Sequence, residues 1–318
     1  MSNKKVAIIG ECMFELKGQP FGEMQHSYGG DTLNTAVYLS RMSTEVSPFY
    51  ITAVGNDATS TQLCQRWCEE GVSTQFVLRD DNHSTGLYII NVDADGERSF
   101  QYWRDNSAAK YLVQHDDFKN VLQEIMKMDA VYLSGISLAI LNKADRDILF
   151  SSLKLCRQNG AEIIFDSNYR PVLWESLEAA RSTYNKMLNL SDIALMTFDD
   201  EQAIWGDISP VETLNRLQKS EVSKAVVKTG SEGCIYQNFN TDQNYRLVPG
   251  IKVNRVVDTT SAGDSFNGAF LAFYLSGQNI QSCCKAANLL AGQVIQHKGA
   301  IIPKSVTQNV YHSLKANL

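Results

Sequence analysis

The sequence predicts an α/β fold, in which a doubly wound, mostly parallel sheet is flanked by helices and carries a smaller β-sheet. Short β-branched runs alternate with amphipathic stretches along most of the 318 residues, a rhythm typical of parallel strands joined by helices. Two segments break that rhythm with the alternation of exposed strands. The chain is also long enough for one large core to carry an appended element.

The predicted strands of the large sheet are short apolar runs without a regular polar face. Strands covered by helices on both sides have this composition, because neither face meets water. In chain order they are residues 6–9, 49–54, 130–134, 162–166, 192–196 and 224–228.

The predicted helices lie between these runs, where apolar residues recur at helical spacing. They span residues 32–42, 60–70, 143–158 and 177–190, and the C-terminal third adds 261–276 and 280–297, both rich in small residues. The resulting alternation places helices on both faces of the sheet.

The two segments that break the rhythm, residues 12–30 and 85–105, are predicted to form a small β lid. In the second, Asp95-Gly96 lies between alternating stretches, which is typical of a tight hairpin, and Tyr88 falls on the same face as Ile90. We expect one domain, residues 1–318, that includes this lid. Because exposed sheets with free edges can pair between subunits, a homo-oligomer is expected.

Composition narrows the partners to small molecules. The 29 Lys and Arg against 35 Asp and Glu give a net charge of −6, which argues against a nucleic-acid surface. The first apolar stretch ends at Gly10 and is too short for a signal peptide or membrane span. Seven cysteines lack CxxC spacing, as expected in a reducing compartment, so we expect a cytoplasmic protein without membrane contact.

The sharpest motif is DTTSAGDSF, residues 258–266, which lies between a strand-like stretch and an apolar helix. Its small residues form a turn that leaves backbone N–H groups free at a helix start, where an anion can bind. Asp264 would then lie beside a bound phosphate, a position suited to handling a proton. The alternative is an ordinary capped helix, with Thr260 or Ser261 as N-cap and Asp264 complementing the helix dipole.

This motif, continued to Phe270, resembles the second signature of ribokinase-type (PfkB) carbohydrate kinases, and Gly29-Gly30-Asp31-Thr32-Leu33-Asn34 resembles the first. The resemblance covers essentially the whole chain. It implies a ribokinase-like fold, with ATP and Mg²⁺ as cofactors and a sugar held between lid and sheet. It also implies that Asp264 is the general base, and that the N–H groups of Ala262, Gly263 and Asp264 stabilise the transferring phosphoryl group. The helix start is expected to lower the pKa of Asp264.

The nucleotide site implied by the resemblance centres on Lys228 and the glycine turn that follows it. A plain turn between strands would carry the same glycines. The implied nucleotide-binding residues are Asn168, Arg170, Lys228, Gly230, Gly233, Ser261, Ala262, Gly263 and Asn288. Glu201 lies near the family's N-x-x-E motif and is the predicted metal residue, although Thr197 or Phe198 replaces the Asn. A monovalent cation such as K⁺ near Asp258, as in some relatives, is left open.

Substrate-side segments resemble the family members that phosphorylate 2-keto-3-deoxygluconate at its 6-hydroxyl to give the 6-phosphate and ADP. These segments are Gly10-Glu11-Cys12-Met13, Tyr102-Trp103-Arg104 and Asn168-Tyr169-Arg170. This sugar acid has a carboxylate, which favours an arginine fork. The implied substrate-binding residues are Gly29, Gly30, Asp31, Asn34, Tyr88, Tyr102, Arg104, Arg170 and Asp264.

Several of these residues also have ordinary structural explanations. Arg104 could be an exposed hairpin charge, and Arg170 could cap a loop. The pair Gly29-Gly30 could simply make a turn, and Asp31 could be an N-cap. Two other functions are considered. A fructokinase or ribokinase of the same fold would not need paired arginines. A sugar-binding regulator without catalysis should have lost Asp264 or the glycine turn, and both are present.

Overall fold

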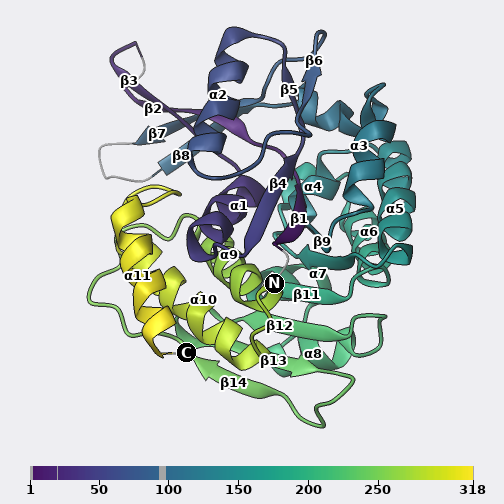
Figure 1. Ribbon diagram of the computed structural model, residues 1–318, viewed down its shortest axis with the longest axis vertical. Coiled ribbons are helices and arrows are strands. Elements are labelled where there is room, and N and C mark those ends of the chain that lie inside the picture. The colour runs from purple at the N-terminus through teal and green to yellow at the C-terminus, as the bar shows by residue number, and fades with distance from the viewer. Residues whose placement is uncertain (1–2, 20, 93–97, 318) are drawn as a thin grey trace.

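A computed structural model describes residues 3–19, 21–92 and 98–317. Its centre is an eight-stranded sheet in the order β14-β13-β12-β11-β10-β9-β1-β4 (Figure 1). Six strands from β4 to β12 run parallel, β13 is antiparallel to them, and β14 is antiparallel to β13. The strands are β1 (Lys4–Ile9), β4 (Val46–Ile51), β9 (Ala130–Ser134), β10 (Glu162–Asp166), β11 (Ile193–Thr197), β12 (Lys224–Lys228), β13 (Gly233–Asn238) and β14 (Arg246–Pro249).

Helices cover both faces of this sheet, which confirms the predicted doubly wound α/β fold. One face packs against α1 (Asp31–Met42), α2 (Ala58–Glu69), α9 (Ala262–Leu275), α10 (Ile280–Val294) and α11 (Lys304–Asn317). The other packs against α3 (Phe118–Ile125), α4 (Gly135–Ala139), α5 (Lys143–Gln158), α6 (Leu177–Leu188), α7 (Phe198–Trp205) and α8 (Pro210–Leu217). Alternate residues of β1 enter opposite cores, Val6 and Ile8 on one side and Ala7 and Ile9 on the other. Consecutive residues in the covered part of such a strand must therefore all be apolar.

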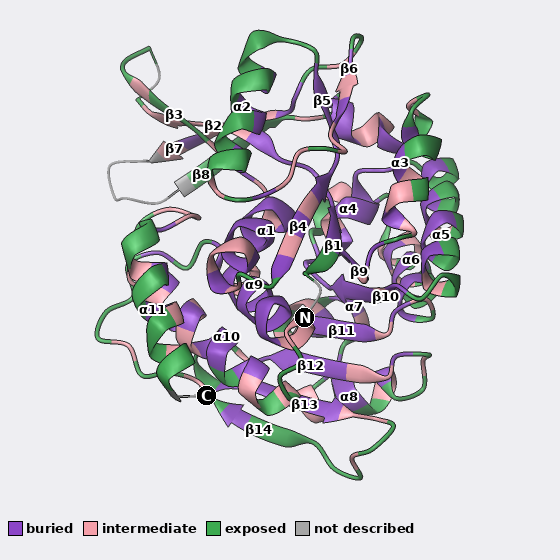
Figure 2. Ribbon diagram, viewed as in Figure 1, coloured by how far each residue is buried: buried purple, intermediate pink, exposed green. Residues whose placement is uncertain are grey.

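A second, four-stranded sheet has the order β3-β2-β7-β8 and projects from the upper left of the molecule in Figure 1. Its strands are β2 (Met13–Gly18), β3 (Met24–Gly29), β7 (Leu87–Val92) and β8 (Arg98–Trp103). Met13, Tyr88 and Ile90 form its buried face, whereas much of β8 is exposed (Figure 2). The face shared by Tyr88 and Ile90 is as predicted. The predicted turn at Asp95-Gly96 lies outside the described residues.

The predicted strand 49–54 is wrong at its end, because the chain changes partner after Ile51. β5 (Ala53–Gly55) pairs in parallel with β6 (Leu78–Asp80) in a separate two-stranded sheet. The Thr52 carbonyl already accepts a hydrogen bond from the Leu78 N–H at 2.9 Å. Three short 3₁₀ helices complete the fold: η1 (Ala108–Gln114), η2 (Pro171–Leu173) and η3 (Gly230–Glu232). Within the described ranges, no helix has the length and apolarity needed to cross a membrane.

The close packing of α1 against α9 brings the N-termini of both helices to the same end of the sheet. A Cβ on Gly268 of α9 would lie 2.7 Å from the Tyr38 Cβ and 2.8 Å from the Thr35 carbonyl oxygen of α1. Only a residue without a Cβ permits this approach. Gly268 is therefore a determinant of how the two helices meet.

We expect Gly268→Ala to lower the free energy of unfolding by about 1–3 kcal/mol, because the added methyl overpacks a rigid contact. Gly292→Ala in α10 is the matched control. There the Cβ meets the Ile251 Cβ at 3.3 Å, and a gain in helix propensity of roughly 1 kcal/mol acts in the opposite direction. Urea denaturation of both variants measures the difference. Equal losses of stability would contradict this account of the contact.

Candidate active site

A cavity of about 570 Å³ lies where the parallel strands end, between the small sheet and the start of α9. It receives residues at or just after the ends of β1, β9, β10, β11 and β12, as expected for the carboxyl ends of strands in an open α/β sheet. The lining comprises Glu11, Met13, Gly29, Gly30, Asp31, Tyr88, Phe100, Tyr102, Arg104, Asp105, Ile136, Asp166, Asn168, Arg170, Val172, Leu173, Thr197, Asp200, Lys228, Thr259, Thr260, Ser261, Ala262, Gly263 and Asp264. Most of the predicted site residues are thus brought together.

The start of α9, where the anion site is predicted, lines the cavity. Ser261 occupies the N-cap position in a left-handed conformation (φ 64°) and makes no side-chain capping bond. The Ala262 N–H donates to the Thr259 carbonyl at 3.2 Å, and its role as an anion donor stays a prediction. In the described part of the chain, the N–H groups of Gly263 and Asp264 have no recorded acceptor. The site therefore has two free N–H groups at the positive end of the helix.

The Asp264 side chain is half-buried beside these groups and is held by α1. Its Oδ2 accepts a hydrogen bond from Asn34 Nδ2 at 2.8 Å, and Thr35 Oγ1 donates to its backbone carbonyl at 3.2 Å. Asn34 thus contacts the candidate base. It lies outside the cavity lining, and its predicted contact with substrate stays a prediction. Ordinary helix capping does not explain a carboxylate held in this way.

The expected lowering of the Asp264 pKa is wrong. Burial first, and then the negative charge of Asp31, raise this pKa to about 7, with a further contribution from Asp166. The Asn34 hydrogen bond acts in the opposite direction but is outweighed, as is the helix dipole. A carboxylate with a pKa near neutrality is well matched to proton transfer.

Asp31 begins α1, and its N-cap is Gly30, so the alternative that Asp31 is an N-cap is wrong. Its carboxylate lines the cavity and accepts a hydrogen bond from Asn168 Nδ2 at 2.7 Å. Burial raises the pKa of Asp31. Asn168 has a left-handed backbone (φ 28°), so two of the non-glycine residues with positive φ, Asn168 and Ser261, line the same cavity. Such strain concentrates at functional sites.

Gly29 and Gly30 line the cavity and make room for the protein's own atoms. A Cβ on Gly29 would lie 2.3 Å from the Tyr88 hydroxyl, and one on Gly30 would lie 2.3 Å from the Glu11 carbonyl oxygen. The packing of the small sheet against the end of β1 accounts for both glycines without a ligand.

Arg104 is mostly buried and is paired with a carboxylate, so the alternative of an exposed hairpin charge is wrong. Its side chain is 11% exposed and pairs with Glu11, which is 1% exposed and also accepts from Ser107 Oγ at 2.5 Å. The Arg104 Nε has no partner among the described residues. Arg170 lies exposed at the rim and donates to the Tyr169 carbonyl at 2.8 Å. Both arginines line the cavity.

The two predicted tyrosines face each other across β7 and β8. Tyr88 and Tyr102 are paired in register with ring centroids 5.8 Å apart. The Tyr88 hydroxyl donates to Glu15 Oε2 at 2.5 Å, whereas Tyr102 is half exposed. This pair lines the cavity together with three other residues of the small sheet, Met13, Gly29 and Phe100.

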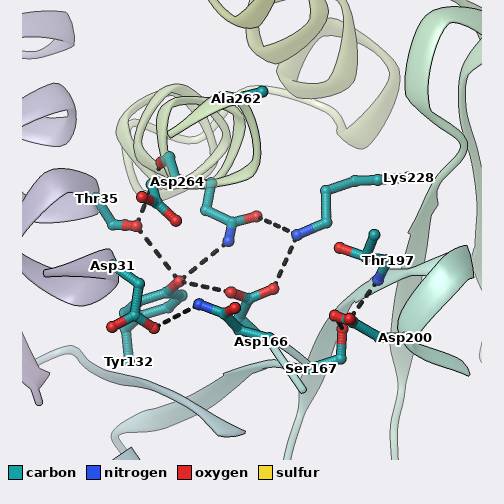
Figure 3. Close-up of polar contacts among 12 residues, drawn as sticks. Asp31, Thr35, Tyr132, Asp166, Ser167, Thr197, Asp200, Lys228, Ala262 and Asp264 are labelled. Carbon is teal, nitrogen blue, oxygen red and sulfur yellow. Dashed lines mark hydrogen bonds and ion pairs between the residues drawn. The ribbon is translucent and has the colours of Figure 1, made fainter. Parts of the chain in front are cut away.

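A buried polar network connects the strand ends to α9 (Figure 3). Lys228 Nζ contacts Asp166 Oδ1 at 2.8 Å and Asn267 Oδ1 at 3.1 Å. Asn267 Nδ2 donates to the Tyr132 hydroxyl at 3.0 Å. The Lys228 ammonium is thus held at the cavity by two buried acceptors, one on each side.

Glu201 does not face the cavity, which contradicts its prediction as a metal residue. It is fully buried, and its Oε2 pairs with Arg216 Nη2 at 2.5 Å. Asp200 lines the cavity instead and accepts from Ser167 Oγ at 2.9 Å. Burial, followed by the charge of Asp166, raises the Asp200 pKa. The motif runs from Thr197 to Asp200, so helix α7 turns Asp200 inward and Glu201 toward α8.

The remaining predicted residues lie outside the cavity lining. Gly230 has a positive φ of 61°, and a Cβ on Gly233 would meet the Val248 carbonyl oxygen at 2.2 Å, so the turn itself requires both. Asn288 Nδ2 donates to the carbonyls of Val248 and Pro249 at 3.2 and 3.0 Å. Roles of Gly230, Gly233 and Asn288 in nucleotide binding stay predictions.

Sequence reasoning missed several residues of this site: Glu11 as the partner of Arg104, Asp166, Asp200, Tyr132 and Asn267. One signal was available for Asp166, because it ends the predicted strand 162–166, where a parallel sheet places its ligands. Tyr132 and Asn267 looked like ordinary members of an apolar strand and helix.

Comparisons with known proteins agree with this geometry. The family model described as "pfkB family carbohydrate kinase" matches residues 3–307. A 2-dehydro-3-deoxygluconokinase of Haemophilus influenzae is 52% identical over 303 residues, covering 95% of this chain and 96% of the relative. One from Dickeya dadantii is 45% identical over 312 residues, with 95% and 98% covered.

A comparison with solved structures shows similarity of fold. The structure of a putative ribokinase II from E. coli, in complex with ATP and Mg²⁺, matches with a TM-score of 0.81 at 23% identity. The match covers the whole of both chains. The ribokinase-like fold predicted from the sequence is therefore confirmed.

We expect Asp31→Asn to lower the pKa of Asp264 below about 7, because the neighbouring negative charge that favours the protonated form is removed. Carbon-13 NMR titration of aspartate carboxyl groups measures this directly, with Asp264→Asn to assign the signal. Asp147→Asn, at an exposed position, is the control. An Asp264 pKa that is unchanged or higher in Asp31→Asn would contradict the proposed charge coupling.

Proposed function

The chain belongs to the pfkB family of carbohydrate kinases, and from that premise we propose that it is a 2-dehydro-3-deoxygluconokinase. The reaction transfers the terminal phosphoryl group of ATP to the 6-hydroxyl of 2-dehydro-3-deoxy-D-gluconate, also called 2-keto-3-deoxygluconate, and releases ADP. One observation carries the proposal: two arginines and the candidate base Asp264 line a single cavity.

Asp264 is the general base of the proposed reaction. The substrate hydroxyl forms a bond to phosphorus as the bond to the ADP oxygen breaks, and its proton passes to the Asp264 carboxylate. The pKa of about 7 keeps a useful fraction of this group ionised at neutral pH while leaving it basic enough to accept a proton. The free N–H groups of Gly263 and Asp264 bind the negative charge on the transferring group.

The carboxylate of the sugar acid is the proposed ligand of Arg104 and Arg170. Arg104 is held in place by the buried Glu11, and its unpartnered Nε leaves an N–H group to be satisfied. Arg170 at the rim supplies a second, more mobile guanidinium. A planar fork that binds a carboxylate through two parallel hydrogen bonds gives affinity and orientation together. Tyr88, Tyr102, Asp31 and the backbone at Gly29 and Gly30 complete the proposed sugar site.

ATP is proposed to lie toward Lys228, Asn168 and the start of α9. Mg²⁺, which neutralises phosphate charge when bound, fits the carboxylates of Asp166 and Asp200 that face this part of the cavity. No cluster of three or more metal-binding side chains occurs in the described ranges. A magnesium ion that is held by one or two carboxylates together with phosphate oxygens does not need one.

Three finer expectations belong to the same proposal. A cytoplasmic location fits a reaction that consumes ATP, and the outer strands β3 and β8 of the small sheet offer edges for a homo-oligomer. A monovalent cation such as K⁺ near Asp258 would have to share its carboxylate, which accepts from the N–H groups of Thr260 and Gly299 at 3.0 Å each.

Asp264→Asn is expected to lower kcat by roughly 10²- to 10⁴-fold, the range typical of losing a general base. The side chain keeps its size and loses only its basicity. Coupled ADP release with Mg²⁺ and ATP measures turnover. Asp199→Asn, at an exposed position in the first turn of α7, serves as the control and should match the wild type. Near-normal turnover by Asp264→Asn would contradict the assignment of Asp264 as the general base.

A substrate panel tests the choice of sugar. We expect turnover with 2-keto-3-deoxygluconate to exceed that with fructose, ribose and gluconate at equal concentration. Arg104→Lys should lower kcat/KM for the keto acid by 10-fold or more, about 1.4 kcal/mol, since it keeps the charge opposite Glu11 but loses the planar fork. Arg66→Lys, on the exposed face of α2, is the control. Faster turnover of fructose or ribose would support the kinase assignment but contradict the proposed substrate. No turnover of any of the four sugars would favour a sugar-binding regulator.

A further inference from the structure

We propose that Tyr132 and Asn267 are positioning residues that hold the Lys228 ammonium between Asp166 and the anion site at the start of α9. Neither Tyr132 nor Asn267 lines the cavity. The inference rests on the proposed phosphoryl transfer and is independent of which sugar accepts the phosphate.

The Tyr132 hydroxyl is the centre of the buried network in Figure 3. Tyr132, on β9, is 1% exposed, and its hydroxyl accepts from Asn267 Nδ2 at 3.0 Å. The hydroxyl also reaches Asp166 Oδ2 at 3.5 Å and Thr35 Oγ1 at 3.4 Å. One hydroxyl thus connects α1, β10 and α9, the elements that carry the catalytic carboxylates and the anion site.

Lys228 and Tyr132 together fix which way the Asn267 amide points. With Nδ2 donated to the Tyr132 hydroxyl, Oδ1 is directed at Lys228 Nζ, 3.1 Å away. The opposite amide orientation would place N–H groups against an ammonium, which can only donate. Asn267 is fully buried, so water cannot replace either partner, and an unsatisfied amide there is costly.

Asn267 in turn gives the Lys228 ammonium a second hydrogen-bond acceptor besides Asp166. The ammonium has three N–H donors, and the described residues supply two acceptors, Asp166 Oδ1 at 2.8 Å and Asn267 Oδ1 at 3.1 Å. Lys228 also lines the cavity, and Nζ lies 3.9 Å from where a Cβ on Gly263 would be. The third N–H is therefore available to a phosphate oxygen at the anion site.

The position of Lys228 also affects the base. The titratable groups around Asp264 come from four elements: Asp31 and Tyr38 on α1, Tyr132 on β9, Asp166 on β10 and Lys228 on β12. Both tyrosines are neutral, because burial raises their pKa values. The pairing of Lys228 with Asp166 limits the field that Asp166 exerts on Asp264. Displacing the ammonium should therefore raise the Asp264 pKa further.

Two substitutions disturb this network at residues that do not themselves line the cavity. Tyr132→Phe removes the hydroxyl, and Asn267→Leu removes the amide at nearly constant volume. Each should lower kcat/KM for ATP by roughly 10- to 100-fold, the cost of a misplaced catalytic group. Each should also move the acidic limb of the kcat–pH profile to higher pH. The double variant should be no worse than Asn267→Leu alone, because both changes act on the same contact.

Tyr274→Phe is the matched control. Tyr274 lies on the same helix, and its hydroxyl donates to Glu162 Oε1 at 2.7 Å, at the opposite end of β10 from the cavity. It should lose thermal stability as Tyr132→Phe does while keeping the wild-type kcat/KM for ATP and pH profile.

A lower melting temperature for Tyr132→Phe with unchanged kinetics and pH profile would reduce its role to stability and overturn the proposal. Additive losses in the double variant would also overturn it. If Asn267→Leu does not fold, Asn267→Ser replaces it in the cycle. Titration of the Asp264 carboxyl by NMR in Tyr132→Phe needs no substrate. This inference can therefore fail while the kinase assignment stands. Wild-type inactivity on every sugar would remove the kinase assignment and the kinetic part of this inference, whereas the NMR titration would still test the effect of the network on Asp264.

Discussion

The site depends on three carboxylates held close together in one partly buried cavity. Asp31, Asp166 and Asp264 come from α1, β10 and α9, and burial together with their mutual repulsion raises the pKa of Asp264 to about 7. Burying a cluster of carboxylates costs folding free energy unless neighbouring groups offset their charge. The hydrogen bond from Asn34, the Asn168–Asp31 contact and the Lys228–Asp166 pair do so. Much of the surrounding architecture brings these partners together.

The alternation of strands and helices was predictable because neither face of a helix-covered strand meets water, so that the centres of 130–134 and 162–166 are apolar on both faces. The end of β4 could not be predicted from the sequence, since the change of strand partner at Thr52 depends on a tertiary hydrogen bond. In the site, the DTTSAGDSF turn identified Asp264, but the sign of its pKa shift depended on Asp31 and Asp166, which are far away in the chain. The inward turn of Asp200 in place of Glu201 likewise depends on how α7 packs.

The small sheet is joined to the main body by charge as well as by packing. Glu11 follows β1, and its buried carboxylate binds Arg104 and Ser107, which follow β8. Arg104 would therefore meet the proposed ligand carboxylate with its own charge already partly compensated. A buried charge pair with one unsatisfied N–H favours a ligand that completes the hydrogen bonds and disfavours one that cannot. Specificity at this end of the cavity then depends on shape and hydrogen bonding more than on net charge.

Phosphoryl transfer makes conflicting electrostatic demands, because negative charge near a carboxylate makes it more basic but repels phosphate. The structure separates the two demands in space. Asp31 and Asp166 raise the pKa of Asp264 from α1 and β10, whereas the groups proposed to bind the phosphate are the free N–H groups of Gly263 and Asp264 at the start of α9 and the Lys228 ammonium on β12. Asp264 belongs to both sets, with its side chain among the carboxylates and its N–H at the anion site. A hydroxyl that reaches its carboxylate is therefore already beside the group it attacks.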